Sequence, residues 1–359
     1  MRIHDRYILK QFWRNVAIGI VAFVVIYVTV DVNENIDDYI DHHAAFLDVA
    51  SYYIFMVPWI LVLISPVAVL LSTIFSFGKL SRDNELTAFI ASGVSLVRIA
   101  LPVIVSAFMV SLIILGMNEL VVPKTNRAAG RVKTINIEKK REKRSKRFKM
   151  NFHYQGENNW MYYAQRYDIK LKTLTEAVVQ KYNGSNLVKR IDARRGVWDG
   201  SKWVFLNGAV REFDQSGEKV EPFKKLEMPE LRERPEDFSK EEIEPEDMNY
   251  AQLKNYIDKL RRGGGPVDKY LVDLHFKFSF PFISLIFAVI GVALSSAKMK
   301  PSMATGFGMT LMISFTYYGI LRIGQALGHS GVIQPFLGAW IGNLIFLVVG
   351  VVLLYRANR

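Results

Sequence analysis

The chain has 359 residues, half of them hydrophobic, no cysteine and a formal net charge of +12. Long apolar runs at both ends and a polar middle exclude an ordinary soluble globular protein, and the length allows several membrane spans plus one domain. Without cysteine the chain cannot form disulfides or thiolate metal sites, and its six histidines are too scattered to predict a metal site. The excess of basic residues is expected to lie in loops at the membrane surface rather than to bind nucleic acid.

Three apolar segments occupy the first third of the chain, at residues 12–30, 52–77 and 99–122. Each is long enough for a helix to cross the hydrocarbon core of a bilayer, which takes about 20 residues. The basic N-terminal stretch leads into the first segment without a small-residue cleavage site, so we expect a retained span rather than a signal peptide. Prolines in the second segment are compatible with a span, because neighbouring helices satisfy the freed carbonyls.

The link between the second and third segments predicts a short amphipathic helix over residues 81–92. Ser81 is suited to the N-cap, and Asp83 and Glu85 fall in the first turn, where the helix dipole favours negative charge. Gly93 is suited to end the helix, because glycine adopts the left-handed conformation without strain. We therefore expect a helix with an acidic start in this loop.

The apolar face of this helix is predicted to consist of Leu86, Phe89 and Ile90, at helical spacing. Such a helix lies on the membrane surface, docks by its apolar face into a groove on a soluble partner, or simply connects two spans. Helices on the membrane surface usually carry Lys and Arg on the polar face. The residues by themselves leave these three functions open.

The polar middle of the chain contains short segments of alternating polar and apolar residues, rich in Tyr, Val, Trp and Phe. They lie at residues 161–167, 175–181, 187–193, 196–198, 202–206 and 209–213. Turn-forming sequences separate them, at Tyr182-Asn-Gly-Ser, Asp199-Gly-Ser and Asp214-Gln-Ser-Gly. This pattern is typical of an antiparallel β-sandwich or roll, either as a functional domain or as a folded loop that stabilises the helices.

Three further apolar segments complete the chain, at residues 276–295, 303–327 and 332–355. Before them, the acidic stretch 235–247 is predicted to be a solvated linker, and residues 250–261 have the periodicity of a short connecting helix that ends at a glycine run. We therefore predict an α-helical membrane protein with an inserted β domain and six transmembrane helices in two groups of three.

Basic residues in the short loops predict the orientation of these helices. They occur before the first segment, between the second and third, between the fourth and fifth, and after the sixth, as Arg2, Arg6, Lys10, Arg14, Lys79, Arg82, Arg98, Lys298, Lys300, Arg356 and Arg359. Alternating spans put all four groups on one side, which the positive-inside rule assigns to the cytoplasm. Both termini are thus expected in the cytoplasm and the middle domain outside, with the basic run 138–149, because long translocated domains largely escape this rule.

Four segments carry a resemblance to a known family. They are Asp5-Arg-Tyr at the start, Glu85-Leu with Ala91-Ser-Gly in the link helix, Glu119-Leu-Val-Val-Pro123 after the third span, and Asp273-Leu-His-Phe-Lys-Phe-Ser-Phe-Pro281 at the fourth. In this order and spacing they resemble the LptF/LptG permeases (the YjgP/YjgQ family) of the Gram-negative lipopolysaccharide exporter. The resemblance covers essentially the whole chain, and the opening is closer to LptG.

The resemblance implies a permease subunit of an ATP-driven lipopolysaccharide exporter in the inner (cytoplasmic) membrane. It implies transmembrane helices 1–3 with the coupling helix in residues 1–134, a periplasmic β-jellyroll-like domain in 135–247, and a connecting helix with transmembrane helices 4–6 in 248–359. The implied partners are a second LptF/LptG-type permease, an LptB-type ATPase dimer, LptC- and LptA-type periplasmic jellyroll proteins, and lipopolysaccharide within membrane lipid. The chain lacks Gly-x4-Gly-Lys-[Ser/Thr], so we predict no enzyme and no cofactor of its own; ATP is bound by the partner.

The resemblance makes the link helix the coupling helix of the permease. Glu85 matches the acidic residue of the family that faces the ATPase, and Leu86 and Phe89 are expected to fill a groove on it. Together with the residues of the first turn, the implied coupling residues are Ser81, Arg82, Asp83, Glu85, Leu86 and Phe89.

A cavity that receives a phosphorylated lipid needs apolar walls and cations near its outer rim. The candidate lipid-binding cations are Lys277, Arg322, Arg127, Arg131 and Lys133. Lys277 matches the basic position of the family in the fourth span. For each cation the alternative is that the long side chain merely extends to the membrane interface.

Residues 31–38 depart from the family pattern. They read Asp-Val-Asn-Glu-Asn-Ile-Asp-Asp, whereas the LptG-type members carry lysines that contact the lipid there. Those contacts cannot be carried over. Either the partner permease supplies the cations, a divalent ion bridges acid to phosphate, or the lipid differs; we hypothesise the first.

Two other functions fit parts of the pattern. A membrane scaffold or assembly factor with an outer β domain has the same layout without transport, and an adjacent permease gene with a nearby ATPase gene favours export over it. A secondary transporter requires broken spans at matched positions or a buried acid–base pair, and the sequence predicts neither.

Overall fold

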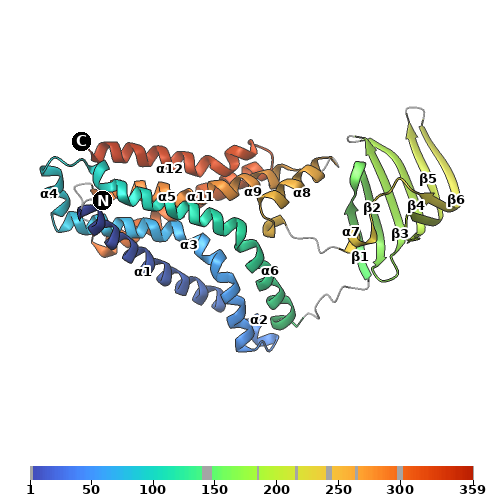
Figure 1. Cartoon of the computed structure of the whole chain (residues 1–359), viewed down its shortest axis with the longest axis horizontal. Helices are drawn as coiled ribbons and strands as arrows, with labels where there is room; N and C mark the ends of the chain where they lie inside the picture. Colours follow the sequence, from blue (N-terminus) through green and yellow to red (C-terminus); the bar gives the residue numbers. More distant parts are fainter. Residues whose placement is uncertain are drawn as a thin grey trace. The chain divides into compact units, whose positions relative to one another are not determined.

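A computed structural model of the chain describes residues 3–139, 148–183, 186–214, 217–239, 245–262, 266–296 and 302–358. The chain forms two compact units. The helical unit consists of residues 1–139, 246–253 and 268–359, and the β unit of residues 140–245 and 254–267. The predicted fold class is confirmed at this level, because a mid-chain β domain separates two groups of helices (Figure 1).

The helices of the helical unit form two groups, with the β domain between α6 and α9 in the chain. In chain order they are α1 (Ile3–Glu34), α2 (Ile36–Asp41), α3 (Phe46–Arg82), α4 (Glu85–Ala91), α5 (Leu96–Leu120), α6 (Val122–Val132), α9 (Asp268–Ser279), α10 (Ile283–Ser296), α11 (Met303–His329) and α12 (Pro335–Ala357). A π-helical turn, Lys133–Ile137, follows α6. The predicted connecting helix is α8 (Tyr250–Arg262), whose residues are divided between the two units.

Among the described residues, four helices are long and apolar enough to cross a membrane, namely α1, α3, α5 and α12. The pair α9 and α10 makes a fifth if it is counted as one bent span. α11 has 27 residues, which is long enough to span, but its glycines, threonines and tyrosines make it less apolar. Six spans therefore stay a prediction, whereas the membrane character of the helical unit is clear.

The predicted span 276–295 consists of two helices, α9 and α10, bent by 52°. Pro281 lies at the break. Proline interrupts a helix because it lacks an N–H and its ring clashes with the carbonyl four residues earlier. The carbonyl of Ser279 accepts a hydrogen bond from Nδ2 of Asn343 at 2.6 Å, and the hydroxyl of Tyr317 donates to Oδ1 of Asn343. Asn343 thus donates a hydrogen bond to a backbone carbonyl that would be bonded within the helix if the helix were continuous. Inside a membrane such a carbonyl needs a partner from the protein, because no water is present.

We expect Asn343→Leu to lower the free energy of unfolding by about 1–3 kcal/mol, because it leaves the carbonyl of Ser279 and the hydroxyl of Tyr317 without partners in a buried place. Thermal unfolding of the purified chain in detergent measures the effect. Leu344→Ala is the matched control, since Leu344 is exposed on the same helix. An unchanged melting temperature for Asn343→Leu would show that this network does not stabilise the break.

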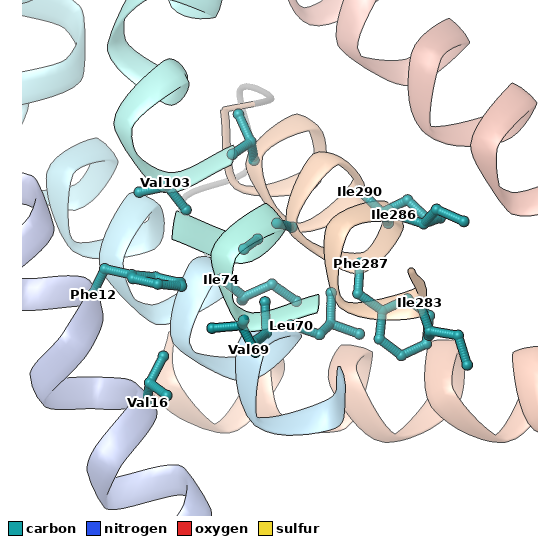
Figure 2. Packing of buried hydrophobic residues seen from close by; sticks show 14 of the residues in the cluster. Phe12, Val16, Val69, Leu70, Ile74, Val103, Ile283, Ile286, Phe287 and Ile290 are labelled. Atoms are coloured by element: carbon teal, nitrogen blue, oxygen red, sulfur yellow. The ribbon is translucent and has the colours of Figure 1, made fainter. Parts of the chain in front are cut away.

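Helix α3 is the centre of the helical unit and packs against α1, α5, α10 and α11. Figure 2 shows part of this packing, which gathers Phe12, Val16, Val69, Leu70, Ile74, Val103, Ile283, Ile286, Phe287 and Ile290. Ser72 and Thr73 lie in the same core, and their hydroxyls donate to the carbonyls four residues earlier. Because lipid is as apolar as these side chains, close packing rather than exclusion of water stabilises this core.

Helices α11 and α12 cross at glycines spaced by four residues. These are Gly324 and Gly328 on α11 and Gly338 and Gly342 on α12. A Cβ added to Gly338 would lie 3.0 Å from Cα of Gly328. Small residues at this spacing let helix backbones approach closely in a membrane, which holds α11 in the bundle.

The β unit contains one six-stranded antiparallel sheet with the strands in sequential order. The strands are β1 (Phe148–Gln155), β2 (Trp160–Asp168), β3 (Thr173–Asn183), β4 (Asn186–Trp198), β5 (Trp203–Asp214) and β6 (Gly217–Met228). The sequence analysis missed β1 and β6. The antiparallel sheet is confirmed, and the jellyroll arrangement stays a prediction.

Two predicted strand breaks are wrong. Segments 187–193 and 196–198 form one strand, β4, and segments 202–206 and 209–213 belong to one strand, β5. Glycines near both predicted breaks allow close approach within the sheet: a Cβ on Gly208 would lie 2.0 Å from a carbonyl oxygen of β4, and one on Gly196 would lie 2.9 Å from the ring of Phe205.

The predicted turn at Asp199 is confirmed, since its carboxylate accepts hydrogen bonds from the backbone N–H groups of Ser201 and Lys202. These bonds lower the pKa of Asp199. The tips of the other two predicted turns, at residues 184–185 and 215–216, lie outside the described residues.

The acidic stretch 235–247 is not a solvated linker over its whole length. Its first part forms α7 (Pro235–Ser239), and Phe238 is fully buried in the apolar core of the β unit. The sequence analysis missed this helix because the stretch is mostly acidic and contains only one aromatic residue. A single large apolar side chain is nevertheless enough to anchor a short segment. Residues 240–244 lie outside the described residues.

Candidate functional site

The loop between α3 and α5 holds the helix predicted at residues 81–92. The observed helix, α4, is shorter because α3 continues to Arg82. Ser81 is therefore not an N-cap: it is buried in the last turn of α3. Asn84 separates the two helices with a φ of 60°, a left-handed conformation that asparagine tolerates better than most residues.

Helix α4 ends as predicted, at Gly93. The φ of Gly93 is +88°, and its N–H donates to the carbonyl of Ile90 at 2.9 Å. The N–H of Val94 donates to the carbonyl of Phe89 at 3.1 Å, which completes a Schellman motif. The chain then turns directly into α5.

The side chains of Leu86 and Phe89 turn toward the helices of this chain. Leu86 is 3% exposed in the apolar core, and Phe89 is half-buried against that core. Leu86 is already packed within the chain, which contradicts its predicted place in a groove on an ATPase, whereas for the half-buried Phe89 that place stays a prediction. Ile90, assigned to the same face from its spacing, is 47% exposed instead.

The first turn of α1 fixes α4 and the start of α5. Asp5 is buried, and its Oδ2 accepts a hydrogen bond from Nη2 of Arg98 at 3.5 Å. The hydroxyl of Tyr7 donates to Oε1 of Glu85 at 3.3 Å. The sequence analysis quoted Asp5 only as part of a motif and Arg98 only as an orienting charge. Their pairing has no sequence signal, because 93 positions separate them.

The outward surface of α4 and of the turn before it is polar and accessible. Arg82, Asp83, Thr87 and Ile90 are exposed, and Glu85 is half-exposed. Carboxylates beside an apolar side chain suit charge-assisted hydrogen bonds to basic groups of a soluble protein. Of the six predicted coupling residues, Arg82, Asp83 and Glu85 therefore remain available to a partner.

Basic residues of the predicted cytoplasmic loops gather at this end of the helical unit. Both chain termini and α4 lie there (Figure 1). The described basic residues on the adjoining helix ends are Arg6, Lys10, Lys79, Arg82, Arg98 and Arg356. Arg2, Lys298, Lys300 and Arg359 lie outside the described residues. Basic residues of the short connections on one end fit the positive-inside rule for a cytoplasmic face.

The far end of α5 carries the second candidate site. Nζ of Lys277, on α9, lies 3.9 Å from Oε1 of Glu119, and these side chains are 12% and 23% exposed. Oε2 of Glu119 accepts a hydrogen bond from the backbone N–H of Tyr250 at 2.7 Å. Among the described residues Oε1 of Glu119 has no hydrogen-bond partner. The ammonium group thus faces a carboxylate oxygen at 3.9 Å, longer than a hydrogen bond, and its role in lipid binding stays a prediction.

Three other predicted cations follow α5 on α6 and the turn after it, which pack against α3. Nε of Arg127 donates to a backbone carbonyl of its own helix at 2.7 Å. Lys133 lies over the ring of Tyr52, 6.0 Å from the centroid, and Arg131 is exposed. These contacts fit side chains that extend along a membrane interface.

Arg322 is exposed on α11, where its Nη1 donates to Oε1 of the buried Gln325 at 3.2 Å. The same helix ends at His329, whose Nε2 lies 3.0 Å from Oδ1 of Asp273 on α9. Asp273 precedes Lys277 by one helical turn. The sequence analysis quoted Asp273 within a motif but assigned it no contact.

Two acids of residues 31–48 form side-chain hydrogen bonds within the chain, whereas Glu34, Asp37, Asp38 and Asp41 are exposed. Oδ2 of Asp31 accepts a hydrogen bond from the hydroxyl of Tyr53 at 2.6 Å, and Oδ1 of Asp48 accepts one from Nδ2 of Asn136 at 2.6 Å. In the part of the chain that the structure describes, no group of three or more His, Asp or Glu side chains is placed to hold a metal ion.

Comparison with protein families gives one match, described as lipopolysaccharide export system permease LptF/LptG, over residues 6–356. Comparison with curated proteins finds no match. The family match includes both groups of helices and the β domain, and it confirms the resemblance carried by the four sequence segments, without separating LptF from LptG. This chain therefore belongs to the LptF/LptG family of lipopolysaccharide export permeases.

Proposed function

We propose that this chain is a permease subunit of an ATP-driven exporter, which extracts lipopolysaccharide from the inner membrane and passes it to a periplasmic bridge of β-jellyroll proteins. The observation that carries the proposal is the family match over residues 6–356. A helical unit with apolar, membrane-length helices and a separate β unit supports it.

The proposed topology has six spans, with the fourth bent at Pro281 and α11 as the fifth. Both termini and α4 face the cytoplasm, and the β domain is a periplasmic jellyroll. The basic residues gathered at the end that holds α4 support this orientation. A single cysteine at Lys10, in a chain without any other, then reacts with an impermeant maleimide only from the cytoplasmic side. Labelling from the periplasm would contradict the topology.

The proposed partners are a second LptF/LptG-type permease, an LptB-type ATPase dimer that binds ATP, and LptC- and LptA-type proteins that receive the lipid. The ATPase contacts the exposed face of α4 through Arg82, Asp83 and Glu85. The partner permease supplies the cations that the acidic residues 31–38 lack. The hydrogen bond that Asp31 accepts from Tyr53 supports this over a divalent ion bridging that carboxylate to the lipid.

We further propose that α5 carries the movement from the ATPase to the lipid. Arg98 in its first turn is tied to Asp5 beside α4, and Glu119 in its last turn faces Lys277. A helix of 25 residues is about 37 Å long and transmits displacement as one body. A shift of α4 then changes the separation between Glu119 and Lys277, which makes the ammonium group available to a lipid phosphate.

The test is purification of the tagged full chain in mild detergent, with mass spectrometry of the bound proteins and lipid. We expect a second permease, an ATP-hydrolysing subunit and lipopolysaccharide. An unrelated multi-span protein with the same tag, purified in parallel, is the control for non-specific capture. Failure to retain any ATP-hydrolysing subunit, together with no ATP-dependent lipid release from proteoliposomes, would refute the proposal.

A further inference from the structure

Residues 229–238, here called the strap, follow β6 and cover one face of the β-sheet. Leu231, Glu233 and Pro235 are buried, and the residues between them are exposed. This alternation is that of an extended segment lying flat on a surface. The strap ends in α7, beside β1 (Figure 1), where Phe238 is fully buried.

Phe238 lies in a cage of aromatic rings. Its centroid is 4.8–5.6 Å from those of five rings on β1, β2 and β5, namely Phe152, Tyr154, Tyr162, Tyr167 and Trp203. Leu231 belongs to the same apolar cluster. The strap therefore supplies apolar groups that cover this face, whose own buried side chains include many aromatic rings.

Side chains of the sheet donate three hydrogen bonds to the strap, and Nζ of Lys172, after β2, donates to Oε1 of Glu236 at 3.3 Å. The hydroxyl of Tyr162 donates to the carboxylate of Glu233 at 2.5 Å, Nε1 of Trp203 to the carbonyl of Glu233 at 2.8 Å, and the hydroxyl of Tyr167 to the carbonyl of Pro235 at 3.0 Å. Burial raises the pKa of Tyr162 and the neighbouring Glu233 raises it further, so the hydroxyl keeps the proton that it donates. A few bonds around an apolar anchor suit a segment that is exchanged as a unit.

We propose that the strap is an internal occupant of an acyl-chain site: Leu231 and Phe238 fill the aromatic face of the sheet until a lipid acyl chain displaces them. The inference rests on the proposed function and deepens it, because it names the surface that takes the acyl chains and the segment that must leave. The exchange replaces one buried apolar group by another, so the hydrophobic free energy nearly balances. The bonds from Tyr162, Trp203 and Tyr167 then favour return of the strap after the lipid has passed.

The test locks the strap in the full chain, purified with its associated subunits and reconstituted with lipopolysaccharide and ATP. A Cβ added at Gly156 would lie 2.7 Å from Cδ of Glu233, so Gly156→Cys with Glu233→Cys places two thiols within reach of a disulfide in a chain that has no cysteine. A photoreactive benzophenone amino acid replaces Tyr154, which faces Phe238. The same replacement at Tyr163, on the opposite face of β2, is the control.

With the disulfide reduced, we expect lipopolysaccharide adducts at position 154 and none at 163. Oxidation is expected to reduce the adduct at 154 at least about fivefold, and reductant restores it. Glu233→Cys alone shows no such redox dependence. Phe238→Leu, which keeps an apolar side chain and hence the fold, is expected to raise the adduct yield because the anchor in the ring cage is smaller.

Equal adducts at position 154 in the oxidised and reduced protein would overturn the inference and leave export intact. Export without any adduct at position 154 in either the parent or Phe238→Leu would also overturn it, because the lipid then avoids this face. If the parent chain releases no lipid and forms no adduct, the proposed function itself fails, and the inference fails with it.

Discussion

Glu85→Arg is expected to reduce ATP-dependent lipopolysaccharide transfer at least about tenfold, while the chain still folds and inserts. Glu85 is half-exposed at the start of α4, and its carboxylate accepts a hydrogen bond from the hydroxyl of Tyr7. Charge reversal places a guanidinium against the basic groups of the ATPase that we propose to meet this carboxylate. Like charges at an interface cost several kcal/mol, and about 1.4 kcal/mol changes an equilibrium tenfold.

Lipid transfer and ATP hydrolysis measured on the same proteoliposomes test this result, because an uncoupled exporter hydrolyses ATP without moving lipid. Thr87→Arg introduces a guanidinium at an exposed position of α4 without removing a carboxylate, and it is expected to have a smaller effect. Tyr7→Phe removes the hydrogen bond and keeps the carboxylate. If Tyr7→Phe impairs transfer as much as Glu85→Arg, then Glu85 acts through the placement of α4 within this chain. Unchanged transfer in Glu85→Arg would remove it from the interface.

Lys277→Met is expected to reduce lipid transfer about ten- to a hundredfold, because a hydrogen bond to a charged group contributes about 1.5–3 kcal/mol. The same substitution leaves Glu119 as an uncompensated carboxylate among packed helices, so thermal stability falls as well. Transfer from proteoliposomes and unfolding in detergent separate these two effects. Lys277→Arg keeps the charge and is expected to retain most of the transfer.

The decisive variant combines Lys277→Met with Glu119→Gln. It removes both charges, so we expect the melting temperature to recover while transfer stays low. Recovery of transfer as well would show that Lys277 only balances Glu119 and does not bind the lipid. Glu119→Gln by itself frees the ammonium group, and we expect it to increase the lipopolysaccharide retained on purification.

The helical and β regions were predictable from sequence because each has a local signature. Apolar runs of membrane length predict helices, since only internally hydrogen-bonded backbone is stable in lipid. Alternating residues around turns such as Asp199-Gly-Ser predict strands. Gly93 ended α4 as expected, because only glycine takes its left-handed conformation freely. The family match then identified the chain as an LptF/LptG permease, as the four segments indicated.

Other features depend on contacts that no local pattern contains. Spacing grouped Leu86 with Ile90, yet packing buries the first and exposes the second. Proline was visible at position 281, but the asparagine that satisfies the nearby backbone lies on another helix.

The order of apolar and polar residues along the chain thus determined that this protein has membrane helices and an inserted sheet, because the solvent around each segment selects its secondary structure. Only the tertiary structure decided which faces pack together, since pairs such as Asp5 with Arg98 or Phe238 with its ring cage join residues far apart in the chain. Whether a side chain is buried depends on contacts with residues distant in the sequence, whereas a sequence pattern contains information only about residues close in the sequence.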